Sequence, residues 1–258
     1  MGNQAAGSHP DIVPARLGRV IDGVTHRIGT GFSALHFSDE MFDGAMDPFL
    51  MVDHFVMTGP TFAPHTHAGI SAVTAIFEDA AGSFLNRDTL GNNIALQAGD
   101  LYWLAAAAGA AHEERPEEGA RTHALQIFVD LPAHLKTAPA RALHVRADDV
   151  PQLEGSGYRV RVVLGTSGGA TGATGMPQAI TLLDGTLEPG ARFVHALPAG
   201  QQGWVYAVTG QLTVHAQGEV RVLEAGQATT IDAGPATSIA LETGVATHFA
   251  LLAAAPIR

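Results

Sequence analysis

The sequence contains no cysteine among its 258 residues. This absence excludes disulfide bonds, thiolate metal ligands and thiol nucleophiles, and it fits a reducing compartment. Positive charge is also scarce, with 14 lysines and arginines against 25 aspartates and glutamates, for a net charge of −11. Because no basic run is present that could displace counterions from phosphates, we expect no direct binding of nucleic acid.

Long hydrophobic runs are missing as well. The longest, LYWLAAAAGAA at 101–111, is shorter than the roughly 20 residues that a membrane-spanning helix needs. The first residues contain no apolar segment of a secretory signal, and Ala6 stands where a myristoylation signal has serine or threonine. We therefore expect a cytoplasmic protein without a membrane partner.

The residues that are abundant indicate a β-rich globular chain. Hydrophobic residues make up 46% of the sequence and charged residues 15%, which is the balance of a folded protein and not of a disordered one. Thirty glycines and 14 prolines are spread along the chain and indicate many turns. The length suits one large domain or two of roughly 125 residues.

An internal repeat favours two units. The segments 75–109 and 206–234 each contain an apolar run, a glycine, a second strand-like run, an Ala-Gly turn and a third apolar run. Gly82 and Gly99 are 17 residues apart, and Gly210 and Gly226 are 16 apart. Such spacing indicates a duplicated β unit, although a β-rich chain can also produce it by accident.

The alanine-rich run at 101–111 could also be read as a helix, since alanine favours one. Its counterpart in the repeat, QATTIDAG at 227–234, is β-branched, so we predict a strand in both places. Between the repeats, the proline-bearing stretch 131–145 has a short helical character, and we place the boundary between the two units near residue 140.

Two histidines one residue apart, His65 and His67, occur in the motif PHTHAG. In a strand they would share one face and could converge on a metal ion, whereas in a loop they would be ordinary surface histidines. His112 and Glu114 repeat this spacing in AAHEERPEE, which could otherwise be a solvated charged turn. In a barrel the two pairs can meet, and three imidazoles with one carboxylate would leave two positions of an octahedral ion open.

Several segments together resemble the pirin family of the cupin superfamily. They are DPFLMVDHF (47–55), PHTHAG, NRDTLGN (86–92), AGDLYWLAAAAGAAHEE (98–114) and LQIFVDLP (125–132). The resemblance implies an all-β fold of two tandem cupin (double-stranded β-helix, jelly-roll) barrels with little helix. It divides the chain into an N-terminal metal-binding barrel at 1–140 and a C-terminal barrel at 141–258 without a metal site.

The resemblance also implies a metal centre in the first barrel. The family pattern maps its ligands onto His65, His67, His112 and Glu114, and Fe(II) is the expected ion, with zinc, nickel, manganese and copper as alternatives. The glutamate that general cupins carry a few residues after the first histidines would fall near Ser71 or Ala72 and is missing, which leaves Glu114 in that role.

This chain departs from the family pattern beside those ligands. Thr66 and Ala68 replace the usual proline and arginine of the first motif, and Ala107-Ala108-Gly109 replaces glycine-arginine-glycine. Two arginines are thereby absent, so the pocket should bind an anionic substrate less tightly. In the second repeat, the positions equivalent to the four ligands are Phe193, His195, Thr237 and Ile239, which keep at most one ligand.

The function that the resemblance implies is a metal-dependent dioxygenase with quercetin 2,3-dioxygenase-type ring cleavage of a flavonol-like substrate. Its partners would be a small aromatic molecule and dioxygen, and Glu114 would take the proton of the substrate's hydroxyl. An alternative is an iron-containing, redox-responsive binding or coregulator protein with an unidentified protein partner and no turnover. A third is a cupin that keeps only its fold.

Overall fold

The computed structural model describes residues 16–258. The first 15 residues lie outside the described residues. The predictions about a secretory signal and about Ala6 concern that part of the chain. Strands dominate residues 16–258, and the helical elements there are three short 3-10 turns, namely η1 (Asp39–Phe42), η2 (Ala133–Leu135) and η3 (Ala147–Asp149). The predicted all-β fold with little helix is therefore confirmed. No helix within this part of the chain is long and apolar enough to cross a membrane.

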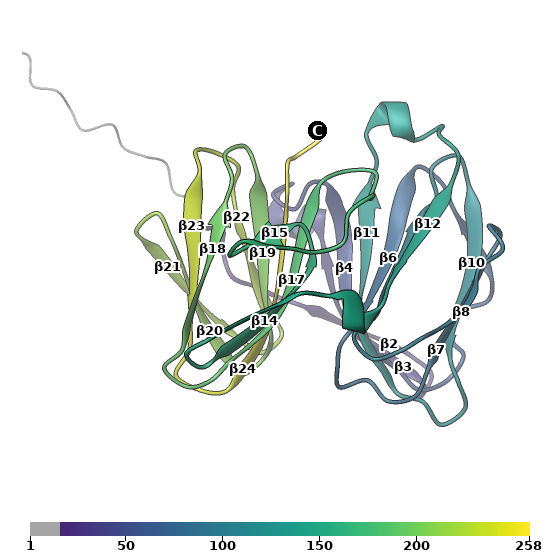
Figure 1. Ribbon diagram of the computed structural model, residues 1–258, viewed down its shortest axis with the longest axis horizontal. Coiled ribbons are helices and arrows are strands. Elements are labelled where there is room, and N and C mark those ends of the chain that lie inside the picture. Colours follow the sequence, from purple (N-terminus) through teal and green to yellow (C-terminus); the bar gives the residue numbers. More distant parts are fainter. Residues whose placement is uncertain (1–15) are drawn as a thin grey trace, which may run out of the picture.

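The strands form two barrels that stand side by side (Figure 1). One face of the first barrel is a seven-stranded sheet, in spatial order β12 (Arg141–Val145), β9 (Leu101–Ala105), β6 (Ile70–Ile76), β11 (Thr122–Asp130), β4 (Phe49–Met57), β3 (Phe32–Ser38) and β2 (Val24–Ile28). The other face is a four-stranded sheet of β5 (His65–His67), β10 (Ala110–Pro116), β7 (Phe84–Asp88) and β8 (Asn93–Leu96).

The second barrel repeats this plan. Its seven-stranded sheet contains β1 (Ile21–Asp22), β22 (Gln227–Ile231), β19 (Gln202–Thr209), β24 (Thr247–Ala254), β17 (Ile180–Leu187), β14 (Tyr158–Leu164) and β13 (Gln152–Gly155). Its four-stranded sheet contains β18 (Arg192–Leu197), β23 (Thr237–Glu242), β20 (Gln211–Ala216) and β21 (Glu219–Glu224), and a small hairpin of β15 (Thr166–Ser167) and β16 (Ala170–Thr171) is attached.

The repeated glycines occupy equivalent turns in the two barrels. Gly82 and Gly210 have φ angles of 74° and 76°, a left-handed conformation that side chains with a Cβ rarely adopt. A Cβ on Gly82 would also collide with Ala120, and one on Gly210 would collide with the backbone of Ala246. The spacing seen in the sequence thus reflects backbone geometry, which confirms that the two halves are repeats of one β unit.

The start of the alanine-rich run is a strand, as the repeat predicts, and no part of the run is a helix. β9 pairs with β6 on one side and with β12 on the other, and all five of its residues are buried. Ala106, Ala107 and Ala108 follow in the turn before β10. The strand pairing and this turn therefore override the helical preference of alanine.

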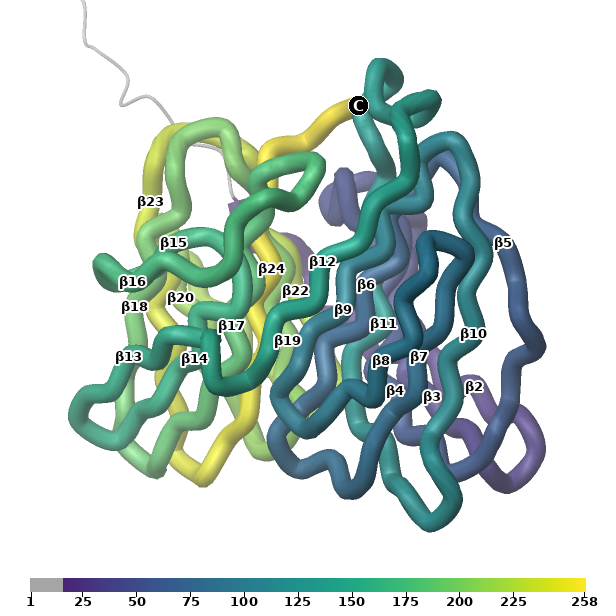
Figure 2. The backbone as a smooth tube through the Cα atoms, turned by 45° about the vertical axis from the view of Figure 1, so that its right-hand side comes forward, coloured from purple at the N-terminus to yellow at the C-terminus, as the bar shows by residue number. Residues whose placement is uncertain are grey.

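In each seven-stranded sheet, one edge strand comes from the other half of the chain. β12, which follows the predicted boundary near residue 140, pairs with β9 of the first barrel, while β1, from the N-terminal part, pairs with β22 of the second. Figure 2 shows β12 lying along the first barrel before the chain enters the second. The predicted helical character of 131–145 is limited to η2, and the division of the chain at 140 stays a prediction.

The two seven-stranded sheets pack against each other through one large apolar cluster. Phe37 of β3 lies 5.5 Å from the ring of Trp204 and 5.3 Å from that of Tyr206, both on β19. Along β11 the side chains alternate, so that Leu125 and Ile127 join this cluster while Ala124 and Gln126 face the inside of the first barrel. Each barrel therefore has an interior of its own, separate from the contact between barrels.

Candidate metal centre

The four predicted ligands lie on two paired strands of the first barrel. β5 consists of His65, Thr66 and His67, so the two histidines share one face of a strand as the sequence predicts. β5 pairs antiparallel with β10 in a register that sets His65 opposite His112. Along β10 every second residue is buried, which turns His112 and Glu114 toward the interior.

Three of these side chains converge on one point. The ring centroids of His65, His67 and His112 are 4.8 to 5.0 Å apart, and one nitrogen from each ring lies within 4.8 Å of the others. The Nε2 atoms of His67 and His112 are 3.1 Å apart. Two ligands at adjacent corners of an octahedron, each about 2.1 Å from the ion, would be separated by about 3.0 Å. The cluster therefore has the spacing that a metal ion requires.

The surroundings of two of these rings keep them in the form that binds metals. Burial first, and then the nearby His65 and His67, together lower the pKa of His112 to about 4. The pKa of His67 is also lowered, mainly by burial and then by His65. The Nδ1 atom of His112 is buried without a hydrogen-bond partner in residues 16–258. Neutral imidazoles with unused lone pairs fit a divalent ion, and the histidine cluster could hold one.

Glu114 lies beside this cluster and is not part of it. Its Oε2 is 4.0 Å from Nδ1 of His112, and its Oε1 accepts a 2.6 Å hydrogen bond from Thr74 Oγ1. The side chain is buried, which raises the pKa of Glu114 to about 7 although the Thr74 hydrogen bond acts in the opposite direction. A cation at the histidines would favour the ionised carboxylate. The role of Glu114 as fourth ligand stays a prediction.

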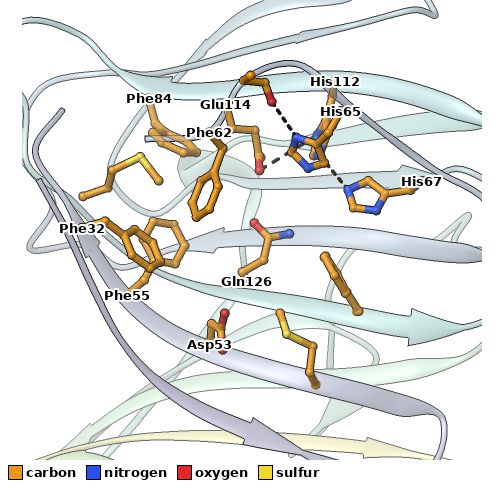
Figure 3. Close-up of a pocket in the computed structure, with 14 residues that line it drawn as sticks. Phe32, Asp53, Phe55, Phe62, His65, His67, Phe84, His112, Glu114 and Gln126 are labelled. Carbon is orange, nitrogen blue, oxygen red and sulfur yellow. Dashed lines mark hydrogen bonds and ion pairs between the residues drawn. The ribbon is translucent and has the colours of Figure 1, made fainter. Parts of the chain in front are cut away.

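The histidines open onto a cavity of about 340 Å³ inside the first barrel (Figure 3). Most of its wall is apolar, formed by Phe32, Met51, Phe55, Met57, Phe62, Ala63, Phe84 and Phe128. Besides the four predicted ligands, the polar side chains in its wall are Asp53 and Gln126. No lysine or arginine is among the described residues that line it. The cavity suits a flat, uncharged molecule of aromatic character.

Sequence reasoning missed Thr74, Asp53 and Gln126. Each is a polar residue whose neighbours two positions away on the inward face of its strand are apolar, on β6, β4 and β11 respectively. That break in the apolar pattern is the signal that could have found them. Their proximity depends on strand register, in which Gln126 is opposite both Asp53 and Thr74.

The equivalent part of the second barrel is filled with apolar side chains. Phe193, Ile239 and Leu241 are all buried in the core cluster of that barrel. His195 is also buried, with Nδ1 3.0 Å from Ser167 Oγ, and it is opposite Ile239 on β23. Burial lowers the pKa of His195 to about 4. Within residues 16–258, the histidines of the first barrel are the one cluster of side chains spaced to hold a metal.

Comparison with known proteins agrees with this geometry. The pirin family profile matches residues 30–129, which include all four predicted ligands. A protein of Pseudomonas aeruginosa that is provisionally named a quercetin 2,3-dioxygenase is 36% identical over 189 residues. The match covers 68% of this chain and 65% of that protein, so the chain spans just under two thirds of this relative.

Solved structures extend the likeness to both barrels. A quercetin 2,3-dioxygenase from Acinetobacter baumannii superposes with a TM-score of 0.82 at 25% identity, over 94% of this chain and 88% of the other. A bacterial pirin from Escherichia coli, solved in complex with nickel(II), has a TM-score of 0.67 at 19% identity over 93% of this chain and 98% of the other. At that identity the likeness shows the fold alone.

Proposed function

Because this chain belongs to the pirin family of cupin proteins, we propose that it is a metal-dependent dioxygenase that opens a ring of a small, flavonol-like aromatic substrate. One observation carries the proposal. Three histidines converge at the wall of a cavity whose remaining surface is mainly phenylalanine and methionine. An oxygenase that acts on flat aromatic molecules needs a metal site in the wall of a cavity lined by aromatic side chains.

We propose His65, His67, His112 and Glu114 as the ligands of Fe(II). Three imidazoles and one carboxylate accept several divalent ions, and the nickel-bound relative is consistent with that tolerance. When bound, the ion supplies a Lewis acid that holds the hydroxyl and keto oxygens of the substrate and brings dioxygen beside them. The first step for the chain's own residues is therefore to hold the ion and to present the substrate to it.

Glu114 is the proposed base for the substrate's hydroxyl proton. The Thr74 hydroxyl donates to Oε1 and fixes the orientation of the carboxylate, so that Oε2 faces the histidines. From there the carboxylate can take a proton from a hydroxyl held at the histidine cluster, and the resulting enolate is the form that dioxygen oxidises. Phe32, Phe55 and Phe62 line the same cavity, where their apolar rings can contact an aromatic substrate and displace water from it.

Oxygen uptake by the iron-loaded protein tests the proposal. We expect quercetin to stimulate uptake, and Glu114→Gln to lower the rate by about 100-fold or more because a general base typically contributes that much. Glu113→Gln is the matched control, since Glu113 is the neighbouring residue on β10 and points to the other side. Metal content is measured for each protein. Full iron occupancy without quercetin-dependent uptake would overturn the enzymatic proposal and favour a redox-responsive binding protein.

A further inference from the structure

A polar row crosses the inner face of the seven-stranded sheet in the first barrel. Strand register sets His36 opposite Asp53, Asp53 opposite Gln126, and Gln126 opposite Thr74. Partners in register project to the same face, so these four side chains form a line across β3, β4, β11 and β6. The register continues from Thr74 to Tyr102 on β9, and Thr74 also donates a hydrogen bond to Glu114 on the opposite sheet.

The rows on both sides of this line are mainly apolar. One contains Ala34, Phe55, Ala124 and Ile76, and the other contains Met51, Phe128 and Ala72, with Ser38 at its β3 end. Polar side chains inside a barrel lose their hydration, so they are favourable only where another group satisfies them. The row is thus a polar line enclosed between two apolar surfaces, and the ring of an aromatic ligand could contact both kinds of surface at once.

Hydrogen bonds within the protein satisfy some of the polar atoms in the row, and the other polar atoms are left for a ligand. Asp53 Oδ1 lies 2.6 Å from His36 Nδ1, and because a carboxylate only accepts, His36 supplies the hydrogen. No hydrogen bond from residues 16–258 reaches the second oxygen of Asp53, which lines the cavity. Gln126 Oε1 lies 3.1 Å from Thr74 Oγ1, whose single hydrogen is donated to Glu114 Oε1 at 2.6 Å, and Gln126 Nε2 is buried without a partner in residues 16–258.

The free donor, Gln126 Nε2, and the free acceptor, the second oxygen of Asp53, belong to neighbouring residues. Asp53 and Gln126 are directly opposite on adjacent strands, which places their Cβ atoms about 5 Å apart. In Figure 3 the Gln126 amide lies between the histidines and Asp53. A group that both donates and accepts can therefore satisfy the two side chains together. A hydroxyl group has this capacity, and a carboxylate or an ether does not.

We propose that Asp53 and Gln126 form a subsite that selects hydroxylated aromatic substrates, an inference that rests on the proposed function. The Gln126 amide donates to the oxygen of a phenolic hydroxyl, and the Asp53 carboxylate accepts its hydrogen. Two carboxylates, Asp53 and Glu114, face a cavity whose described lining contains no lysine or arginine, so the subsite rejects carboxylate-bearing substrates. His36 is a positioning residue that holds the Asp53 carboxylate in place.

Anaerobic binding titrations of the metal-loaded protein test the subsite without turnover. The probes are quercetin and 3-hydroxyflavone, which share the hydroxyl and keto oxygens for the metal but differ in the other hydroxyls. We expect the wild type to bind quercetin about 10- to 100-fold more tightly. Asp53→Asn and Gln126→Leu should each remove that preference and change the affinity for 3-hydroxyflavone by less than about threefold. Glu113→Gln, at a position of β10 that does not line the cavity, is the control and should keep the preference.

The outcomes separate this inference from the proposed function. Equal affinity of the wild type for both probes overturns the subsite even if a variant fails to fold. Preference retained in both Asp53→Asn and Gln126→Leu also overturns it. If 3-hydroxyflavone and quercetin bind with equal affinity and quercetin is consumed with oxygen, the dioxygenase survives while the subsite fails. If neither probe binds the metal-loaded wild type, the proposed function fails as well.

Discussion

The two barrels share one plan of strands and differ in what fills them. Twenty buried residues form the core inside the second barrel, and its strand pair β18–β23 contributes Phe193, Leu197, Ile239 and Leu241 to it. The core inside the first barrel has 12 buried residues, and the corresponding pair β5–β10 carries His65, His67 and His112 beside a cavity. One copy of the unit thus keeps a full interior while the other leaves room for a ligand.

This difference shows that the fold itself does not determine the site. The same sheet pairing supports both an apolar core and a candidate metal centre, and a few inward positions decide between them. Buried polar groups and open space in the first barrel reduce the stability of the fold. The dense apolar packing of the second barrel offsets that loss. Substitutions in the two barrels should therefore affect different properties.

The largest effect is expected from a cavity made in the filled barrel. Phe249 is fully buried in the core of the second barrel, and Phe249→Ala should lower the free energy of unfolding by about 3–5 kcal/mol. Metal content of the protein that remains folded should be unchanged. Chemical denaturation measures the first quantity and metal analysis the second. Loss of metal without loss of stability would contradict the division between barrels.

Next in size is the loss of a histidine from the candidate metal centre. His67→Ala should weaken metal binding by about 100-fold or more, because even the partners that orient metal ligands contribute about 10- to 100-fold. Competition with a chelator measures the affinity. His215→Ala is the control from the second barrel, where that ring lies 3.3 Å from Glu242. Full occupancy in His67→Ala would remove the proposed site.

The buried His195 gives the second barrel a pH dependence of its own. Its folded pKa of about 4 lies below the usual 6.5, so the unfolded chain binds the proton first as the pH falls. The free energy of unfolding should therefore decrease between pH 6.5 and 4, on the order of 2–3 kcal/mol from this group.

Replacement of the ring tests this assignment. His195→Leu should lose that part of the pH dependence relative to the wild type, as measured by denaturation at several pH values. Ser167→Ala is the matched control, because it removes the 3.0 Å contact to Nδ1 and keeps the titrating ring. An unchanged slope in His195→Leu would show that other groups are responsible.

The smallest effect is expected at the mouth of the open barrel. Phe62 is 40% exposed and packs edge-on against Phe32 at 5.1 Å. Phe62→Ala should change the free energy of unfolding by less than about 1 kcal/mol, since an aromatic pair contributes about that much. Its effect should instead appear as weaker binding of flavonols. A stability loss equal to that of Phe249→Ala would mean that the first barrel is also held together by its lining.

The sequence was informative where local spacing determines geometry. The alternation in His65-Thr66-His67 and in His112-Glu113-Glu114 predicts shared faces, and the strands β5 and β10 confirm that both pairs are extended. The glycine spacing likewise predicts a duplicated β unit because left-handed turns recur at fixed intervals. Composition and periodicity are sufficient for such features.

Features that depend on register between distant strands were not accessible from the sequence. Asp53, Thr74 and Gln126 are up to 73 residues apart, and only the pairing of β4, β6 and β11 places them in one row. The cavity depends on how several phenylalanines pack, which spacing does not determine. The position of Glu114 at the edge of the histidine cluster likewise depends on its hydrogen bond to Thr74.

The exchange of edge strands has a consequence for how this protein can be divided. A cut at residue 140 would take β12 from the seven-stranded sheet of the histidine-bearing barrel and leave β1 on the wrong fragment. Each fragment would expose an unpaired sheet edge and the apolar face that carries Trp103 or Trp204, so we expect both fragments to aggregate. We therefore do not expect the histidine-bearing barrel to be usable as an isolated domain. A minimal version for engineering should be sought by shortening loops in the intact chain, or by supplying both pieces so that they reassemble.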